Sequence, residues 1–360
     1  MKILTIIGAR PTFIKSVAIS PFFEEFGIEE KLVHTGQHFD HNMSDIFLSE
    51  YKINKIDYNL NISDKNRIIR LTKTIKAIKD IILNELPDFV MVFGDTDSAI
   101  AGSMAASVTD ARIIHVEAGM RSFEEMPEEL NRIIIDHLSH ILFCPIIEAI
   151  ENLSDEGIDS NIYLVGDVMY DIFVRFKNNI NDKILNDLRI DKEKYVLVTI
   201  HREYNTSKFN KNLELIVEGL LLLLINNFSI VFPIHPRTRE ALIENNLKKL
   251  FSVSPRFKII DPVGYMDMLS LENNAKVIIT DSGGVQKEAA FCGVPCIVLR
   301  NNTEWVNLVK SKNAILVGSD PDKIYSATTI YYENELNAKE ISIGDGWSGR
   351  KIAEALSDMN

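Results

Sequence analysis

Short apolar segments alternate with longer helical patterns along the whole chain, and this alternation limits the fold more than any other feature of the sequence. A first series of expected strands comprises Lys2–Ile7, Lys31–His34, Phe89–Phe93, Arg112–Val116, His140–Cys144 and Asn161–Val165. A second series comprises Tyr195–Ile200, Ser229–Ile234, Phe257–Ile260, Lys276–Thr280, Cys296–Leu299 and Ala314–Val317. Most of these segments are continuously apolar, which is typical of strands covered on both faces. The pattern predicts βαβ units, and therefore an α/β protein with parallel sheets.

The helices show a different period. Between Asn66 and Leu86 the apolar residues recur three or four positions apart, at Ile68, Leu71, Ile75, Ile78 and Ile82. Pro87 predicts the end of this helix, because proline disfavours the helical conformation of the residue before it.

One polar segment separates the two series of strands. Residues Phe173–Lys194 are rich in charged and amide side chains, and they mark the expected domain boundary. We predict a first domain over 1–172 and a second over 173–345. Ligands bind at the carboxyl ends of parallel strands, so two such domains are expected to form a cleft between these edges.

The composition excludes several kinds of partner. The 360 residues include 39 Lys and Arg against 51 Asp and Glu, a net charge of −12, whereas domains that bind nucleic acid carry a basic surplus. The most apolar internal run, Gly219–Ile225, is too short to span a membrane, and the first residues do not resemble a signal peptide. Cys144, Cys292 and Cys296 are too few for a disulfide framework. We therefore expect a cytoplasmic protein without nucleic-acid or membrane partners.

A glycine-containing turn in the second half has the features of a phosphate site. The strand Lys276–Thr280 leads into Asp281-Ser282-Gly283-Gly284, and a helix is expected from Val285. Bare N–H groups at a helix N-terminus favour a bound phosphate, and Glu288 could accept hydrogen bonds from ribose hydroxyls. An ordinary strand-to-helix turn has the same sequence, so the motif alone leaves both readings open.

Cationic residues follow two further strands of the second half. His201-Arg202 comes after one strand, and His235 opens the segment His235-Pro236-Arg237 after the next. A single surface His or Arg is usually only solvated, but two such strand ends in one sheet favour an anion site. Together with Arg10 and Lys15 of the first half they would form a positive region suited to a diphosphate.

The first half contributes carboxylates at the same edge of its sheet. Asp95 and Glu117 each follow an expected strand, and Glu128 lies in the first turn of a helix that begins near Pro127. Acids at helix starts often act only as caps or complement the helix dipole, and we interpret Glu129 in that way. Asp95 and Glu117 lie where the fold requires no acid, which favours a catalytic role. His34, His38 and His41 are not expected to converge, so no metal site is predicted.

Eight motifs in order along the chain resemble the UDP-N-acetylglucosamine 2-epimerase family. They are GARPTFIK (8–15), HTGQH (34–38), GDTDS (94–98), HVEAGMRS (115–122), MPEELNR (126–132), HRE (201–203), HPRTR (235–239) and DSGGVQKEA (281–289), and GDGWSGRKIAEAL (344–356) follows them. The resemblance implies the GT-B fold: two Rossmann-like, doubly wound parallel-sheet domains facing across a cleft. The helix over 346–358 would pack back on the first domain, and the protein would be a homodimer that acts in polysaccharide biosynthesis.

The resemblance also implies roles for individual residues. The catalytic set is Asp95, Glu117, Glu128 and His201. The substrate-binding set is Arg10, Lys15, Gln37, Arg132, His235, Ser282, Gly283, Gly284 and Glu288. One departure from the family pattern is Trp305, which stands where many members have arginine and which puts a phosphate contact there in doubt.

The implied reaction is the interconversion of UDP-N-acetylglucosamine and UDP-N-acetylmannosamine, without a cofactor or metal. UDP would leave together with the C2 proton to give a 2-acetamidoglucal, and re-addition would follow on the other face. Three alternatives stay open at this point: a UDP-2,3-diacetamido-2,3-dideoxy-uronic acid as substrate, a hydrolysing 2-epimerase, and a GT-B glycosyltransferase.

Overall fold

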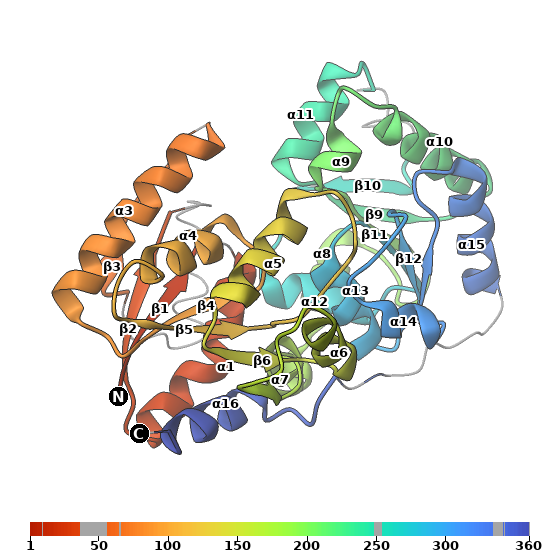
Figure 1. The fold of residues 1–360 in the computed structure, drawn as a ribbon. Coiled ribbons are helices and arrows are strands. Elements are labelled where there is room, and N and C mark those ends of the chain that lie inside the picture. Colours follow the sequence, from red (N-terminus) through yellow and green to blue (C-terminus); the bar gives the residue numbers. More distant parts are fainter. Residues whose placement is uncertain are drawn as a thin grey trace. The chain divides into compact units, whose positions relative to one another are not determined.

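The structure, a computed structural model, forms two compact units (Figure 1). It describes residues 1–8, 10–36, 56–64, 66–247, 254–333, 341 and 343–359, and of Arg10 only the main chain. The first unit comprises Met1–Phe176 together with Ile343–Asn360, and the second comprises Lys177–Ser342.

The first unit is built on a seven-stranded sheet in which all strands are parallel. Its order is β3 (Tyr58–Asn59), β2 (Glu29–His34), β1 (Lys2–Ile7), β4 (Phe89–Phe93), β5 (Arg112–Val116), β6 (Ile141–Cys144) and β7 (Ile162–Leu164). The sequence predicted all of these strands except β3, whose two residues are too few to form a hydrophobic pattern.

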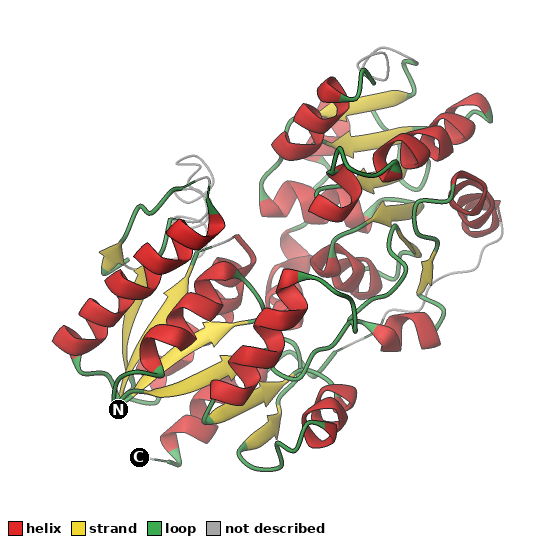
Figure 2. Ribbon diagram, turned by 45° about the horizontal axis from the view of Figure 1, so that its top comes forward, coloured by secondary structure: helices red, strands yellow, loops and turns green. Residues whose placement is uncertain are grey.

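Helices cover both faces of this sheet (Figure 2). They are α1 (Arg10–Glu25), α3 (Arg67–Glu85), α4 (Asp97–Ala106), α5 (Pro127–Leu138), α6 (Ile147–Asp155), α7 (Val168–Phe176) and α16 (Ser348–Ser357). Helices α3, α4 and α5 lie side by side over one apolar cluster, whereas α1 packs against α7 and α16. As predicted, α3 begins after Asn66 and ends before Pro87. The Asn66 side chain caps the helix by accepting the N–H groups of Ile68 and Ile69, and Leu86 is the residue at its C-terminal cap.

The second unit contains a six-stranded, fully parallel sheet. Its order is β10 (Phe257–Ile260), β9 (Ile230–Pro233), β8 (Val196–Thr199), β11 (Val277–Thr280), β12 (Cys296–Val298) and β13 (Ala314–Leu316). The helices of this unit are α8 (Lys183–Leu188), α9 (Glu203–Thr206), α10 (Asn212–Ile225), α11 (Pro236–Glu244), α12 (Tyr265–Asn273), α13 (Gly283–Phe291), α14 (Val306–Lys310) and α15 (Pro321–Glu333), with a 3₁₀ turn at Lys177–Asn179. The main apolar cluster lies between the sheet and α10, α11 and α15.

The polar segment between the two series of strands is structured. It contains the end of α7, the 3₁₀ turn and α8, with Leu185 buried. The hydroxyl of Ser270 in α12 donates to the Asn181 carbonyl at 2.6 Å. Most of this segment is therefore a packed part of the second unit.

Each sheet has one point at which the order of its strands reverses. The reversal lies between β1 and β4 in the first unit and between β8 and β11 in the second. The loops that leave neighbouring strands at such a point run to opposite sides, which makes it the usual ligand site of a doubly wound sheet. The predicted fold class of parallel α/β domains is confirmed. In the described part of the chain, no helix combines the length and the apolar character that crossing a membrane requires.

Candidate active site

Asp95 lies at the reversal point of the first sheet, in the turn between β4 and α4. Gly94 before it has a positive φ of 58°, a conformation that glycine adopts without steric cost, and its N–H donates to the Val116 carbonyl at 2.9 Å. The Asp95 carboxylate forms an ion pair with Arg132 of α5. Asn131 of the same helix donates to the main-chain oxygen of Asp95 at 2.8 Å. The acid is therefore held by α5 at both its side chain and its main chain.

Glu117 follows β5 in a strained main-chain conformation. Its φ is 69°, which costs a residue with a side chain on the order of 1 kcal/mol. The N–H groups of Glu117 and Ala118 both donate to the Phe143 carbonyl, at 3.0 and 3.1 Å, and hold the turn in place. The Glu117 carboxylate forms an ion pair with Lys15 of α1. Lys15, predicted to bind substrate, thus contacts a catalytic candidate directly.

The turns of Asp95 and Glu117 adjoin one another. A Cβ atom placed on Gly94 would lie 3.1 Å from Glu117 Oε2 and 3.2 Å from Lys15 Nζ. The Glu117–Lys15 pair therefore packs against the residue that precedes Asp95. The structure brings two of the three predicted catalytic acids to one point at the carboxyl edge of the sheet.

Helix α5 carries Glu128, the third predicted acid, and Glu129, whose surroundings differ from those we expected. Glu128 is partly exposed in the first turn of the helix. We expected Glu129 only to complement the helix dipole, but its side chain is buried. It accepts the N–H groups of Ser122 and Phe123 and pairs with Arg132 at 2.7 Å. Because these partners come together only in the folded chain, the local sequence could not reveal this role.

The loop that Glu129 holds presents an exposed aromatic side chain. Phe123 has a φ of 57°, and 75% of its surface is exposed. Its N–H donates to Glu129 Oε1 at 2.9 Å, which compensates for the unfavourable conformation. Nothing in the sequence singled out Phe123.

In the second unit, Asp281 organises the reversal point between β8 and β11. Its fully buried carboxylate accepts the N–H groups of His201 and Arg202, each at 3.0 Å, and the Asn205 side chain at 3.1 Å. Burial alone would raise the pKa of Asp281, but the nearby His201 ring and these hydrogen bonds outweigh it and lower the pKa to about 2. Asp281 thus fixes the loop of His201 beside the start of α13.

The N-terminus of α13 has the features of an anion site. The helix begins at Gly283, two residues earlier than predicted, and Ser282 caps it by accepting the Val285 N–H. Gly283 has no room for a side chain, since an added Cβ would lie 2.2 Å from Glu304 Oε1. A Cβ on Gly284 would meet only Ser282 Oγ, at 3.7 Å, so the space beside this residue is open. First-turn N–H groups beside an open space are suited to a phosphate.

Two histidines come together near this helix. The rings of His201 and His235 are 5.8 Å apart between centroids. His235 caps α11 by accepting the Arg237 N–H on Nδ1, and Arg237 donates to the His201 carbonyl at 3.2 Å. The cationic residues that follow β8 and β9 thus form one cluster, as their places in the sequence predict.

Glu288, predicted to bind substrate, and the segment around Trp305 are buried. Glu288 lies inside α13 with 7% of its surface exposed. Trp305 is buried as well, and Lys287 Nζ lies 4.5 Å from the centre of its ring. Glu304 pairs with Arg300 at 2.7 Å. The Trp305 segment therefore belongs to the interior of the second unit.

Two predicted residues cannot be placed. Gln37, with His38 of the same motif, lies outside the described residues, as does the side chain of Arg10. The main chain of Arg10 begins α1, directly after β1.

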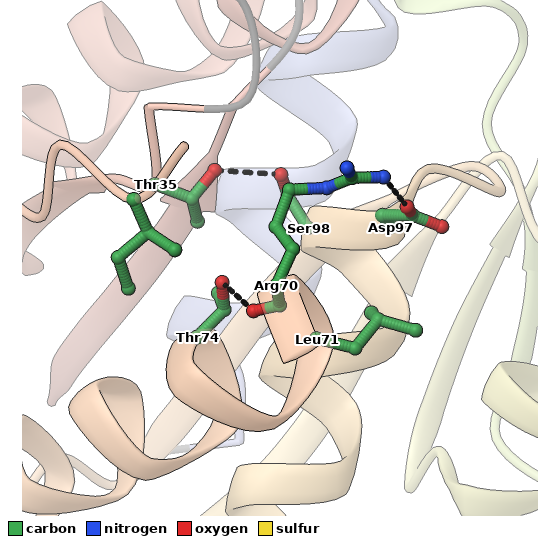
Figure 3. Close-up of a pocket in the computed structure, with 7 residues that line it drawn as sticks. Thr35, Arg70, Leu71, Thr74, Asp97 and Ser98 are labelled. Carbon is green, nitrogen blue, oxygen red and sulfur yellow. Dashed lines mark hydrogen bonds and ion pairs between the residues drawn. The ribbon is translucent and has the colours of Figure 1, made fainter. Parts of the chain in front are cut away.

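A small pocket opens between β2, α3 and α4 of the first unit (Figure 3). Thr35 and Ser98 are hydrogen-bonded at 2.7 Å on its wall, and Arg70 pairs with Asp97 at 2.9 Å. Burial alone would raise the pKa of Asp97, but Arg67 and Arg70 outweigh it and lower the pKa. None of the four residues predicted to be catalytic lines this pocket.

Comparison with known proteins gives one consistent result. The family model described as UDP-N-acetylglucosamine 2-epimerase matches residues 23–357. A UDP-N-acetylglucosamine 2-epimerase homolog of Methanococcus maripaludis is 46% identical, and a UDP-2,3-diacetamido-2,3-dideoxy-D-glucuronate 2-epimerase of Pseudomonas aeruginosa is 42% identical, each over the full length of both chains. The crystal structure of Methanocaldococcus jannaschii UDP-GlcNAc 2-epimerase in complex with UDP-GlcNAc and UDP is 39% identical, with a TM-score of 0.94 over 99% of this chain and 100% of that one.

The depressed pKa of Asp281 predicts how stability depends on pH. A carboxyl group whose pKa falls from 3.8 to about 2 on folding contributes about 2 kcal/mol above pH ~4, and this contribution is lost as the pH falls towards 2. We expect Asp281→Asn to destabilise the second unit by at least this amount at pH 7 and by progressively less in acid, measured by urea unfolding. Asp261→Asn, an exposed carboxylate that pairs with Arg239, is the matched control and should change stability by less than about 0.5 kcal/mol. A constant difference between wild type and Asp281→Asn from pH 7 to pH 2 would contradict the assignment.

Proposed function

The chain belongs to the UDP-N-acetylglucosamine 2-epimerase family, a family of isomerases, and on this premise we propose that it interconverts UDP-N-acetylglucosamine and UDP-N-acetylmannosamine without hydrolysing them. The observation that supports this most strongly is the pair of adjoining turns that carry Asp95 and Glu117. Two acids on adjoining turns at the carboxyl edge of one sheet suit proton transfer at a sugar carbon. A glycosyltransferase needs an acceptor site there instead.

The chemistry of the substrate explains why such acids are needed. The C2 proton of a UDP-sugar has no neighbouring carbonyl group and is not acidic. Loss of UDP creates positive charge at C1, which acidifies the C2 proton and allows elimination to a 2-acetamidoglucal. Re-addition of UDP, with proton return on the other face, completes the epimerisation. General acid–base steps of this kind typically contribute 10²–10⁴-fold.

We assign a role towards the substrate to each group of predicted residues. The start of α13, with Ser282, Gly283 and Gly284, would bind the departing diphosphate, and His201 and His235 would donate hydrogen bonds to it. Asp95, Glu117 and Glu128 would act at C1 and C2. Lys15 and Arg132 stabilise the negative charges of Glu117 and Asp95, in addition to any contact with substrate.

We also propose a cytoplasmic homodimer that supplies a nucleotide sugar for polysaccharide biosynthesis. The family resemblance supports the dimer and the pathway. Free cysteines, two of them buried, suit a reducing compartment. Sedimentation of the purified chain would measure its oligomeric state directly.

The function is tested by incubation with UDP-N-acetylglucosamine in D₂O. Each proton abstraction at C2 is followed by return of a deuteron, so we expect deuterium at C2 in both UDP-sugar epimers, detected by NMR. Free N-acetylmannosamine with UDP would indicate a hydrolysing enzyme. Transfer of the sugar to an added acceptor, with no exchange at C2, would indicate a glycosyltransferase.

A second substrate has specific support. The Pseudomonas aeruginosa relative, named for a diacetamido-glucuronate, is 42% identical, which lies between the 46% of the homolog from Methanococcus maripaludis and the 40% of two relatives named UDP-N-acetylglucosamine 2-epimerase. Sequence identity therefore does not separate the two substrates. Measuring kcat/KM for both UDP-sugars decides between them, and turnover of the uronate alone would replace our first choice.

Asp95 and Glu117 should be required for exchange but not for nucleotide binding. We expect Asp95→Asn and Glu117→Gln each to reduce C2 deuterium incorporation by at least 10²-fold, because a proton acceptor is lost. The affinity for UDP, measured by calorimetry, should stay within a few-fold of wild type. Asp88→Asn is the matched control, since Asp88 lies at the opposite end of β4 and caps the Lys2 N–H. Full exchange in either variant would remove that residue from the mechanism.

Gly284 tests the phosphate site. In Gly284→Val the added side chain would occupy the open space at the start of α13, so we expect UDP to bind at least tenfold more weakly while the melting temperature changes little. The matched control is Gly264→Val at the start of α12, where the space is also open. Equal UDP affinity in the two variants would place the diphosphate elsewhere.

A further inference from the structure

A buried aspartate of α5 contacts the main chain of one acid-bearing turn directly. Asp136 is 1% exposed and lies two turns beyond Glu128 on the helix. Its Oδ2 accepts the Gly119 N–H at 3.1 Å and pairs with Arg121 at 2.8 Å. Gly119 comes two residues after Glu117 and has a φ of 75°. The Phe143 carbonyl thus holds the turn at Glu117 and Ala118, and Asp136 holds it at Gly119.

The other oxygen of Asp136 reaches the second acid-bearing turn through a histidine. Oδ1 lies 2.6 Å from Nδ1 of His115, a fully buried residue of β5. The opposite ring nitrogen, Nε2, lies 2.9 Å from the Gly94 carbonyl. The ring therefore lies between the Asp136 carboxylate and a main-chain carbonyl group. Through this ring Asp136 is linked to the residue immediately before Asp95.

The charges around Asp136 compensate for its burial. Burial alone would raise its pKa, but His115 and Arg121 outweigh it and lower the pKa. Arg121 in turn pairs with Glu156 at 2.7 Å, and Glu156 lies 3.1 Å from the partly exposed His137. A buried carboxylate with such partners is held in one position, because any movement leaves a charge uncompensated.

His115 and Asp136 connect the turns of Asp95 and Glu117, and these turns need contacts from other parts of the fold to stay in place. Glu117 has a positive φ, which is unfavourable for a residue with a side chain, and Gly94 and Gly119 are glycines with many accessible conformations, so the local sequence does not hold these turns in place by itself. Proton transfer, however, requires the two carboxylates at fixed places relative to the sugar. His115 and Asp136 connect the turns through three hydrogen bonds, none of which involves a catalytic side chain.

We propose that Asp136, acting through His115, is a positioning residue that sets the distance between the turns of Asp95 and Glu117. This inference rests on the proposed function, because it assigns the two turns to one proton-transfer site. Asp136 itself does not touch the substrate. Its loss should therefore reduce the rate of the chemical step and leave binding almost unchanged.

The test is Asp136→Asn in the full-length protein. An amide nitrogen in place of Oδ1 removes the acceptor that faces His115, and one in place of Oδ2 removes the acceptor that Gly119 and Arg121 share. We expect kcat and C2 deuterium exchange to fall about 10- to 100-fold, with KM and the affinity for UDP within threefold of wild type. Asp171→Asn is the matched control: Asp171 is also buried in the first unit and accepts a main-chain N–H, that of Gly349 at 2.7 Å, at the start of α16. The control should keep the wild-type kcat.

A second variant keeps the test valid if Asp136→Asn does not fold. His115→Gln removes the link to Gly94 but leaves Asp136 its contacts with Gly119 and Arg121. We expect a similar loss of kcat. When both variants fold, the double variant should lose no more than about threefold beyond either one, because the two residues act as one device. Additive losses, or a wild-type kcat in folded His115→Gln, would overturn the proposal.

One measurement does not depend on activity. Hydrogen exchange of the Gly119 amide should be strongly slowed in wild type and in His115→Gln, and at least tenfold faster in Asp136→Ala, which removes both side-chain oxygens. If wild type turns over no UDP-sugar but this pattern appears, the proposed function fails and the anchoring by Asp136 stands. If the Gly119 amide exchanges equally fast in wild type and Asp136→Ala, the positioning role is wrong even in an active enzyme.

Discussion

The buried polar face of α5 is the constraint on which the site of the first unit depends. Glu129, Arg132 and Asp136 are three and four residues apart, so they lie on one side of the helix, and all three are buried. Burying charge is costly unless partners compensate for it. Here the partners belong to the turns after β4 and β5 and to the loop that carries Ser122 and Phe123. Any shift of α5 would leave a charge uncompensated, so the helix and these three segments hold one arrangement.

The second unit uses the same physical solution with different residues. Asp281 follows β11 at the reversal point of its sheet and gathers the N–H groups of the loop after β8. That loop carries His201, and the helix that begins at Gly283 offers its free N–H groups beside it. In both units a buried aspartate joins the loops of neighbouring strands, β4 and β5 in the first unit and β8 and β11 in the second. The loops after β8 and β11 leave a point of strand reversal in opposite directions, so they need a connection that the sheet itself does not provide.

The sequence was sufficient for the sheets and for the places of the acids, but not for the residues that hold the acids. Continuous apolar runs identify twelve of the strands, and the polar residue that follows a strand must lie at its carboxyl edge, which is why the sequence predicts Asp95 and Glu117 at that edge. Glu129 was misread because its local position suits a dipole role equally well, and its burial depends on Ser122 and Arg132. Asp136 and His115 looked like ordinary residues of a helix and a strand. A contact between elements decided their roles, and no local pattern encodes such a contact.

The cations beside the acids show how a strongly acidic chain can prepare a site for charged intermediates. Lys15 contacts Glu117 and Arg132 contacts both Asp95 and Glu129, so part of the positive charge expected for the substrate is engaged with carboxylates of the chain. Charges fixed in this way before substrate arrives need little reorganisation during the reaction, which is the main source of electrostatic catalysis. In the proposed reaction the same pairing would reduce repulsion between the acids and the UDP-sugar, whose diphosphate is negative. A carboxylate without a cation close by would repel a departing diphosphate, so in that reaction the pairing would allow proton-accepting groups to act near a negatively charged leaving group.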